Sequence, residues 1–324
     1  MSRDQEADAT TRWLREQDTA RTPVDAEPPA FLFALGDRLE RERTAAKRAK
    51  RVRATWAVSL ASLVVVAIIT VSSMLATPPA VASTPVPLTF SSPAPESQVI
   101  ADAVARLSKP GGIDEPTRSV RMVSWAISVE DGKLSKQAVP QVLALDWNAD
   151  LSGTLLIVKG RVEGASSERV GRVVPTRSVI SKQTFKPGEF GAPSADPPAQ
   201  SAQGVQDLLT SVGMPPEPSA GQITDAMATA MQLWTLSDGQ QAQLLTLIAT
   251  HGGESLGEST DRLGRRVLGI RLPSAAKGAE DTVLISPKTG RIVGVETQRT
   301  TAADGIPAGT VVDYQLWETT KESK

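Results

Sequence analysis

Residues 251–257 contain the side chains that come nearest to a nucleophilic catalytic motif. Gly253-Glu254-Ser255-Leu256-Gly257 matches G-x-S-x-G, the pattern that places a serine on a strand-to-helix turn in α/β-hydrolases. In that fold the histidine follows the serine, whereas His251, the one histidine of the chain, precedes Ser255. The surrounding pattern also runs from a helix to a strand. We therefore expect a helix end followed by a strand here, and no hydrolase triad.

A second candidate is a calcium loop. Asp146, Asn148 and Asp150 occupy positions 1, 3 and 5 of the EF-hand pattern. Leu151 stands where that pattern needs glycine, and Ile157 stands where a bidentate glutamate belongs. A tight turn between two strands is the favoured interpretation, and a weak extracytoplasmic calcium site is the alternative.

Composition excludes most other chemistry. Without cysteine and with one histidine, the chain has no thiolate chemistry and no multi-histidine metal cluster. Glycine-rich phosphate loops and paired catalytic carboxylate motifs are absent from the sequence. Scattered serines and lysines leave Ser–Lys catalysis open, but no pair stands out. A formal net charge of -1 also lacks the positive excess of nucleic-acid binders. We expect neither an enzyme, nor a cofactor, nor a nucleic-acid partner.

An uncharged run, Ala54–Ala76, determines where these residues lie. At about 1.5 Å per residue it spans about 34 Å, enough to cross a hydrocarbon core of about 30 Å. A signal peptide and a buried core helix are the alternatives, but 53 residues precede the run and it has no polar stripe. By the positive-inside rule the N-terminus is cytoplasmic and the C-terminal part extracytoplasmic. Arg41 begins the basic stretch before the run, and the residues that set the topology are Arg43, Lys47, Arg48, Lys50, Arg51 and Arg53.

Residues 1–53 are expected to form a cytoplasmic, helical and partly disordered arm. Within it, Phe31, Leu35 and Leu39 follow an i, i+4, i+8 spacing, and Leu32 lies beside them. This apolar stripe requires a contact surface, because such a short charged segment cannot build its own core. The candidates are a cytoplasmic protein partner (a sigma factor or another regulator), the short helix around Trp13, and the inner leaflet of the bilayer.

Residues 77–95 are rich in proline and predict an extended tether. Residues 96–324 predict an extracytoplasmic α+β domain, in which strands, helices and then strands form an antiparallel sheet with helices packed on one face. We expect helices within 97–108, 205–212, 223–234 and 244–248, the last preceded by a cap at Ser237-Asp238. The expected strands are 120–129, 142–147, 154–158, 178–185, 254–260, 266–272, 282–286, 291–298 and 309–319.

The turns of the C-terminal third carry a resemblance. A helix pair followed by Asp261-Arg262-Leu263-Gly264-Arg265, by residues 287–294 and by Gly309-Thr310-Val311-Val312 resembles an actinobacterial family of single-pass membrane proteins, which are often encoded beside extracytoplasmic-function sigma factors. The resemblance covers residues 25–75 and 200–320. It implies a regulatory or envelope role and brings no catalytic residues.

In its order of elements, the extracytoplasmic domain is also similar to the half-open β-barrels of periplasmic lipid carriers and of anti-sigma-linked stress sensors. Two functions follow as expectations. The first is a non-enzymatic envelope sensor or regulator linked to an extracytoplasmic-function sigma factor. The chain lacks the ligands of zinc-type anti-sigma domains, so that mechanism of sequestration is excluded. The alternative is a membrane-anchored binding module for a lipid or another apolar envelope ligand.

Overall fold

The computed structural model describes residues 84–126, 139–166, 170–303 and 306–318, together with the backbone of residues 129–130 and 133–134. The arm with its stripe (Phe31, Leu32, Leu35, Leu39), the basic stretch and the run Ala54–Ala76 lie outside the described residues. Residues 77–83 of the predicted tether also lie outside them. Within the part of the chain that the structure describes, no helix is long and apolar enough to span a membrane.

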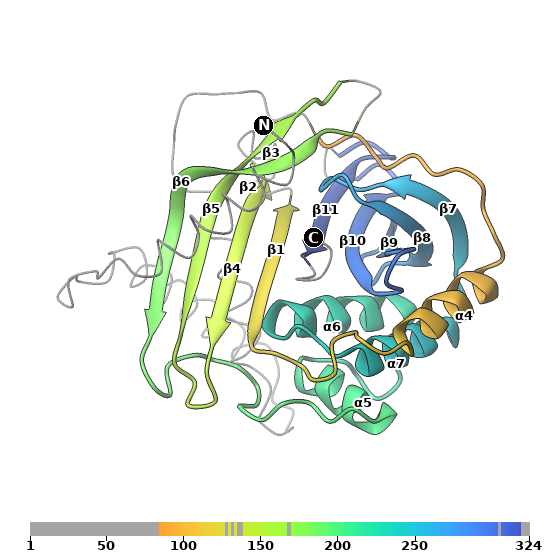
Figure 1. Ribbon diagram of the computed structural model, residues 1–324. Coiled ribbons are helices and arrows are strands. Elements are labelled where there is room, and N and C mark those ends of the chain that lie inside the picture. Colours follow the sequence, from red (N-terminus) through yellow and green to blue (C-terminus); the bar gives the residue numbers. More distant parts are fainter. Residues whose placement is uncertain are drawn as a thin grey trace, which may run out of the picture. The chain divides into compact units, whose positions relative to one another are not determined.

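One antiparallel sheet of nine strands dominates the described residues (Figure 1). The strand order is β6-β5-β4-β1-β11-β10-β9-β8-β7. A separate two-stranded ribbon pairs β2 (Val129–Glu130) with β3 (Lys133–Leu134). The nine strands are β1 (Ser119–Ala126), β4 (Gln141–Trp147), β5 (Gly153–Glu163), β6 (Arg172–Phe185), β7 (Glu254–Thr260), β8 (Arg266–Pro273), β9 (Ala279–Ile285), β10 (Ile292–Arg299) and β11 (Val311–Trp317).

The pairing of β1 with β11 joins the two halves of the chain. Met122 lies opposite Trp317 and Trp125 opposite Tyr314, whose rings stack at 6.0 Å between centroids. The strands that precede the helices and the strands that follow them therefore form a single sheet. The predicted α+β class, an antiparallel sheet with packed helices, is confirmed for this domain.

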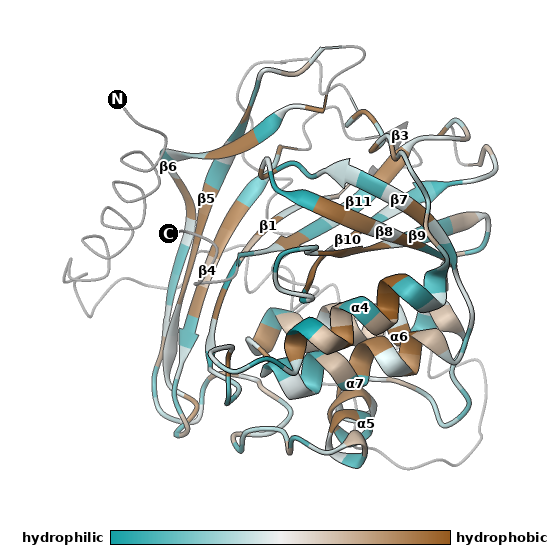
Figure 2. Cartoon of the chain, turned by 45° about the vertical axis from the view of Figure 1, so that its right-hand side comes forward, coloured by the Kyte–Doolittle hydropathy of each residue, from teal (hydrophilic) through white to brown (hydrophobic). Residues whose placement is uncertain are grey.

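Four helices complete the domain: α4 (Glu96–Leu107), α5 (Ala202–Ser211), α6 (Ala220–Leu233) and α7 (Asp238–Ala249). The apolar side chains of all four belong to one core with the facing side chains of the sheet. Figure 2 shows these helices together on one side of the strands. Ser219 and Ser237 each close a capping box with the glutamine three residues later, so α6 and α7 begin where the sequence places a cap.

Over β7, β8 and β10, the opposite face of the sheet is covered by the chain that precedes α4. The Leu88 side chain is buried, and its N–H donates to Glu296 Oε1 at 3.3 Å. Ser91 pairs with Glu258 of β7, and the Phe90 ring lies over Gly269 of β8, where a Cβ would overlap the ring. The described part of the predicted tether, from residue 84 onward, is therefore packed against the domain.

Most predicted elements are observed with small shifts of their ends. The helices begin and end within a few residues of their expected positions, and β7 and β8 match almost residue for residue. β5 and β6 extend well beyond the predicted strands 154–158 and 178–185, because they pair with each other past irregularities in register around Val158. Val129, expected at the end of the first strand, belongs to the separate ribbon instead.

Candidate functional site

Three carboxylates lie within electrostatic reach of one another between α6 and the sheet. Asp281 of β9 lies opposite Thr297 of β10, and Thr297 lies opposite Asp313 of β11. Residues paired in this way share one face of the sheet. Asp225 of α6 is close enough for its charge to raise the pKa values of both Asp281 and Asp313. We call Asp225, Asp281 and Asp313 the acidic cluster.

Strand alternation explains why these carboxyl groups face the helices. Val283 and Ile285 of β9 belong to the core beneath the helices, and Asp281 continues the same face by two residues. On β11, Trp317 belongs to that core, and Gln315 and then Asp313 continue its face away from it. The apolar rows of the sheet thus give way to a polar row.

α6 contributes a matching polar stripe. Asp225, Thr229 and Gln232 follow at spacings of four and three residues, which places them on one side of the helix. The Gln232 amide donates to Gln315 Oε1 at 2.8 Å, so this stripe meets the polar row of the sheet. The acidic cluster is therefore held by a strand register and a helix face, both of which are fixed by the core.

The pKa values of all three carboxyl groups are raised above their ordinary value. Asp281 is 1% exposed, and its Oδ1 accepts a hydrogen bond from Thr297 Oγ1 at 2.7 Å. Burial, and after it the charge of Asp225, raise the pKa of Asp281 to about 6. Burial, and after it the charge of Asp281, raise the pKa of Asp313 to about 7. Burial also raises the pKa of Asp225.

Among the described residues, no lysine or arginine forms an ion pair with any member of the acidic cluster. Nor are three or more histidine, cysteine, aspartate or glutamate side chains of the described residues arranged to hold a metal ion. Because these residues form neither an ion pair nor a metal site, the acidic cluster is best suited to binding protons. Carboxyl groups in a poorly solvated place retain protons toward neutrality, and a second carboxylate within electrostatic reach adds to the cost of ionising each of them.

A second buried carboxylate lies on the other face of the sheet. Glu296 pairs with Arg262 at 2.5 Å, and both side chains are less than a tenth exposed. Burial raises the pKa of Glu296, while the Arg262 guanidinium opposes that rise. Arg262 also lies 4.8 Å from the centre of the Tyr314 ring and donates to the Val86 carbonyl at 2.9 Å. This pair fastens residues 86–88 to the sheet.

The catalytic candidates of the sequence have ordinary structural surroundings. Ser255 lies within β7, and His251 is an exposed residue just after the C-cap of α7, Thr250. The predicted helix end followed by a strand is confirmed. Asp146 pairs with Arg121 at 2.6 Å, and Asp150 accepts from the Ser152 N–H at 2.9 Å within the turn between β4 and β5. The predicted tight turn is confirmed.

Sequence reasoning missed the acidic cluster. The predicted strand 282–286 begins one residue after Asp281, and the predicted strand 309–319 contains Asp313 without indicating that its side chain faces the helices. In the structure β11 is covered on both faces, because Tyr314 and Trp317 are both buried. One signal in the sequence was available: Asp281, Val283 and Ile285 are spaced two residues apart, which places them on the same face of a strand.

Comparison with known proteins gives no family for this chain. No family model matches it, and neither a curated protein nor a solved structure does. The functional argument therefore rests on the α+β fold and on the acidic cluster.

Proposed function

We propose that the chain is a single-pass membrane protein whose extracytoplasmic domain is a non-enzymatic sensor of envelope acidification. The observation that supports this proposal is the acidic cluster, which places three carboxyl groups without a cationic partner between α6 and the sheet. Asp281 is buried, Asp313 is half-buried and Asp225 is exposed beside them, and poorly solvated carboxyl groups without a counter-ion are characteristic of sites whose protonation is used. The run Ala54–Ala76 supplies the membrane span in this proposal.

Protonation strengthens the domain, as the sign of the pKa shifts requires. The pKa values of Asp281 and Asp313 in the folded domain lie above their ordinary value of 3.8. Between 3.8 and these values the folded state holds more protons than the unfolded state, so stability falls as pH rises. Acidification through about pH 7 and then about pH 6 therefore removes repulsion between α6 and the sheet and tightens their contact.

The link to a sigma factor is part of the same proposal. It is supported by the resemblance over residues 25–75 and 200–320 and by the apolar stripe at Phe31, Leu32, Leu35 and Leu39. In this scheme the half-barrel-like sheet domain senses acidification of the envelope, and the cytoplasmic arm contacts the sigma factor or another regulator.

A lipid or another apolar ligand is a less favoured occupant of this face of the sheet. The helices already fill the apolar rows of the face, and the row beyond them carries Asp281, Thr297 and Asp313. Placing an acyl chain against carboxyl groups would remove their remaining hydration without replacing it.

Hydrogen–deuterium exchange on the full chain in detergent micelles tests the proposal. After correction for the intrinsic pH dependence of exchange, we expect α6 to exchange more slowly at pH 5.5 than at pH 8. Asp313→Asn replaces the titrating group with a neutral one of similar shape, and we expect slow exchange at both pH values.

Asp102→Asn is the matched control, because Asp102 is an exposed aspartate on α4. This variant should retain the pH dependence of the unsubstituted protein. If Asp313→Asn retains it as well, and Asp281→Asn does too, the acidic cluster is not the sensor.

A further inference from the structure

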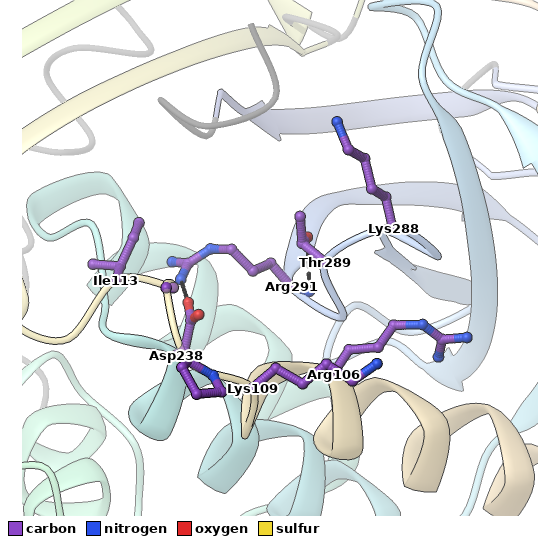
Figure 3. A pocket seen from close by; sticks show the side chains of 10 residues that line it. Arg106, Lys109, Ile113, Asp238, Lys288, Thr289 and Arg291 are labelled. Carbon is purple, nitrogen blue, oxygen red and sulfur yellow. Dashed lines mark hydrogen bonds and ion pairs between the residues drawn. The ribbon is translucent and has the colours of Figure 1, made fainter. Parts of the chain in front are cut away.

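A second site lies away from the acidic cluster, in a pocket of about 280 Å³. Its polar lining consists of Arg106, Lys109, Asp238, Lys288, Thr289 and Arg291 (Figure 3). These side chains come from three separate parts of the domain: the end of α4 with the loop after it, the turn between β9 and β10, and the first turn of α7. The pocket does not use any residue of the acidic cluster.

Backbone contacts bring these three parts together. Gly290 of the β9–β10 turn has a positive φ of 80°, and a Cβ there would overlap the Ala103 carbonyl oxygen of α4. The turn therefore rests directly on the helix, which only glycine allows. On the other side, the Asp238 N–H donates to the Ile113 carbonyl at 2.8 Å and ties the loop after α4 to α7. The pocket walls are thus set by the fold.

One carboxylate of the pocket is already neutralised. Asp238 forms an ion pair with Arg291, and both side chains are largely buried. Arg291 also donates from Nη2 to the Leu236 carbonyl at 2.6 Å. Figure 3 shows Arg291 reaching across to Asp238, while Arg106 and Lys288 extend in other directions. This pair fixes the floor of the pocket and leaves no net charge there.

The other three cations have no such partner. No carboxylate within the described residues forms an ion pair with Arg106, Lys109 or Lys288. The pocket therefore carries three positive charges in excess, and the side chain of Thr289 adds a hydroxyl donor. In a domain whose sequence carries more acidic than basic residues between 77 and 324, this concentration of positive charge is local.

We propose that this pocket binds the phosphate group of a small anionic ligand. A phosphomonoester offers two negative charges and several acceptor oxygens, which suits three long cationic side chains and a hydroxyl better than a single carboxylate would. The volume accommodates a phosphate with a small attached group. The phosphate belongs either to a soluble monoester or to the monoester headgroup of phosphatidic acid, because both present the same chemistry to the pocket.

Isothermal titration calorimetry of the full chain tests the pocket. Dodecyl maltoside micelles and a HEPES buffer keep phosphate out of the background. The probes are inorganic phosphate and glycerol 3-phosphate, added at constant pH. We expect binding to the unsubstituted protein, and we expect the double variant Lys109→Ala and Lys288→Ala to weaken it by about tenfold or more.

The matched control is the double variant Lys186→Ala and Lys277→Ala, which removes the same charge from two exposed lysines outside the pocket. It should bind like the unsubstituted protein. Because Lys109 and Lys288 are exposed, their removal should leave the unfolding midpoint unchanged. Equal affinity in both double variants, or no binding of either probe, would overturn the proposal.

Nanodiscs distinguish the two sources of phosphate. The full chain is reconstituted into phosphatidylcholine nanodiscs that contain either phosphatidylglycerol, an anionic phosphodiester, or phosphatidic acid, a phosphomonoester, and glycerol 3-phosphate is titrated into each. Weaker binding of glycerol 3-phosphate in the nanodiscs with phosphatidic acid identifies a lipid headgroup, because the lipid then competes for the pocket. Equal binding in both kinds of nanodisc identifies a soluble ester. Asp313→Asn should bind phosphate normally, so this result and that of the acidification test are independent.

Discussion

At the scale of single residues, the domain neutralises buried carboxyl groups in two different ways. Asp281 and Asp313 have no cationic partner in the described structure, and burial raises their pKa values to about 6 and about 7. Glu296, on the other face of the same sheet, has the Arg262 guanidinium beside it. One face therefore responds to pH through protons, while the other has a counter-ion.

The buried ion pair between Arg262 and Glu296 leads to a prediction about stability. Arg262→Met leaves Glu296 buried without a partner, and we expect a loss of about 3–5 kcal/mol in the free energy of unfolding at pH 8. The loss should be smaller at pH 5, because without Arg262 the pKa of Glu296 rises further and the group is neutral there. Urea denaturation measures both values.

Two further variants separate charge from packing. Adding Glu296→Gln to Arg262→Met should recover much of the loss, because the unpaired charge is gone. Arg266→Met breaks an exposed pair with Glu258 and should cost less than about 1 kcal/mol. An equal cost for Arg262→Met and Arg266→Met would contradict the assignment of a buried ion pair.

At the scale of elements, α6 and α7 both begin with a capping box, but the two caps have different surroundings. Ser219 and Ser237 both close a capping box, but Ser219 is exposed, whereas Ser237 and its partner Gln240 are fully buried. The Gln240 side chain also donates to the Pro198 carbonyl at 2.7 Å. The start of α7 therefore depends on its cap more than the start of α6 does.

Alanine at each cap tests this difference. Ser237→Ala leaves a buried N–H of α7 unsatisfied, and we expect a cost of about 2 kcal/mol. Ser219→Ala should cost about 1 kcal/mol or less, because water replaces the hydroxyl there. Chemical denaturation at fixed pH compares the two. A larger cost at Ser219 would show that burial does not control the strength of these caps.

The same elements show what could be predicted from the sequence. Caps and turns are local signals, so Ser237 and the turn at residues 261–264 placed α7, β7 and β8 well. The acidic cluster is not local, because its members belong to β9, β11 and α6. Nothing near Asp281 or Asp313 in the sequence shows that the other lies two strands away, with Thr297 between them. The pocket at Lys109 and Lys288 was missed for the same reason.

At the scale of the whole domain, the pairing of β1 with β11 is the decisive contact. The sequence predicts strands before and after the helices but does not show how these two groups of strands pair with each other. The two strands are far apart in the sequence, and a hydrophobic pattern shows which face of a strand is buried but not which distant strand it pairs with. In the structure both groups of strands form one sheet, and the core contains residues from both halves of the described chain.

This continuity predicts a single cooperative unfolding transition for the described domain. Urea denaturation followed by tryptophan fluorescence and by far-ultraviolet circular dichroism should give coincident midpoints. Native-state hydrogen exchange should give similar opening free energies for central amides of β4 and β9, which lie on opposite sides of the junction. Two separated transitions would mean that the halves unfold independently despite the shared sheet.

The chain before α4 is held to the sheet close to its first described residues. Leu88 and Phe90 are packed against the sheet, and seven residues, 77–83, separate the described chain from the proposed span. Seven residues reach at most about 25 Å when fully extended. If the proposed span anchors the chain, tension from the membrane would act first at residues 86–88, which the Arg262–Glu296 pair holds to the sheet.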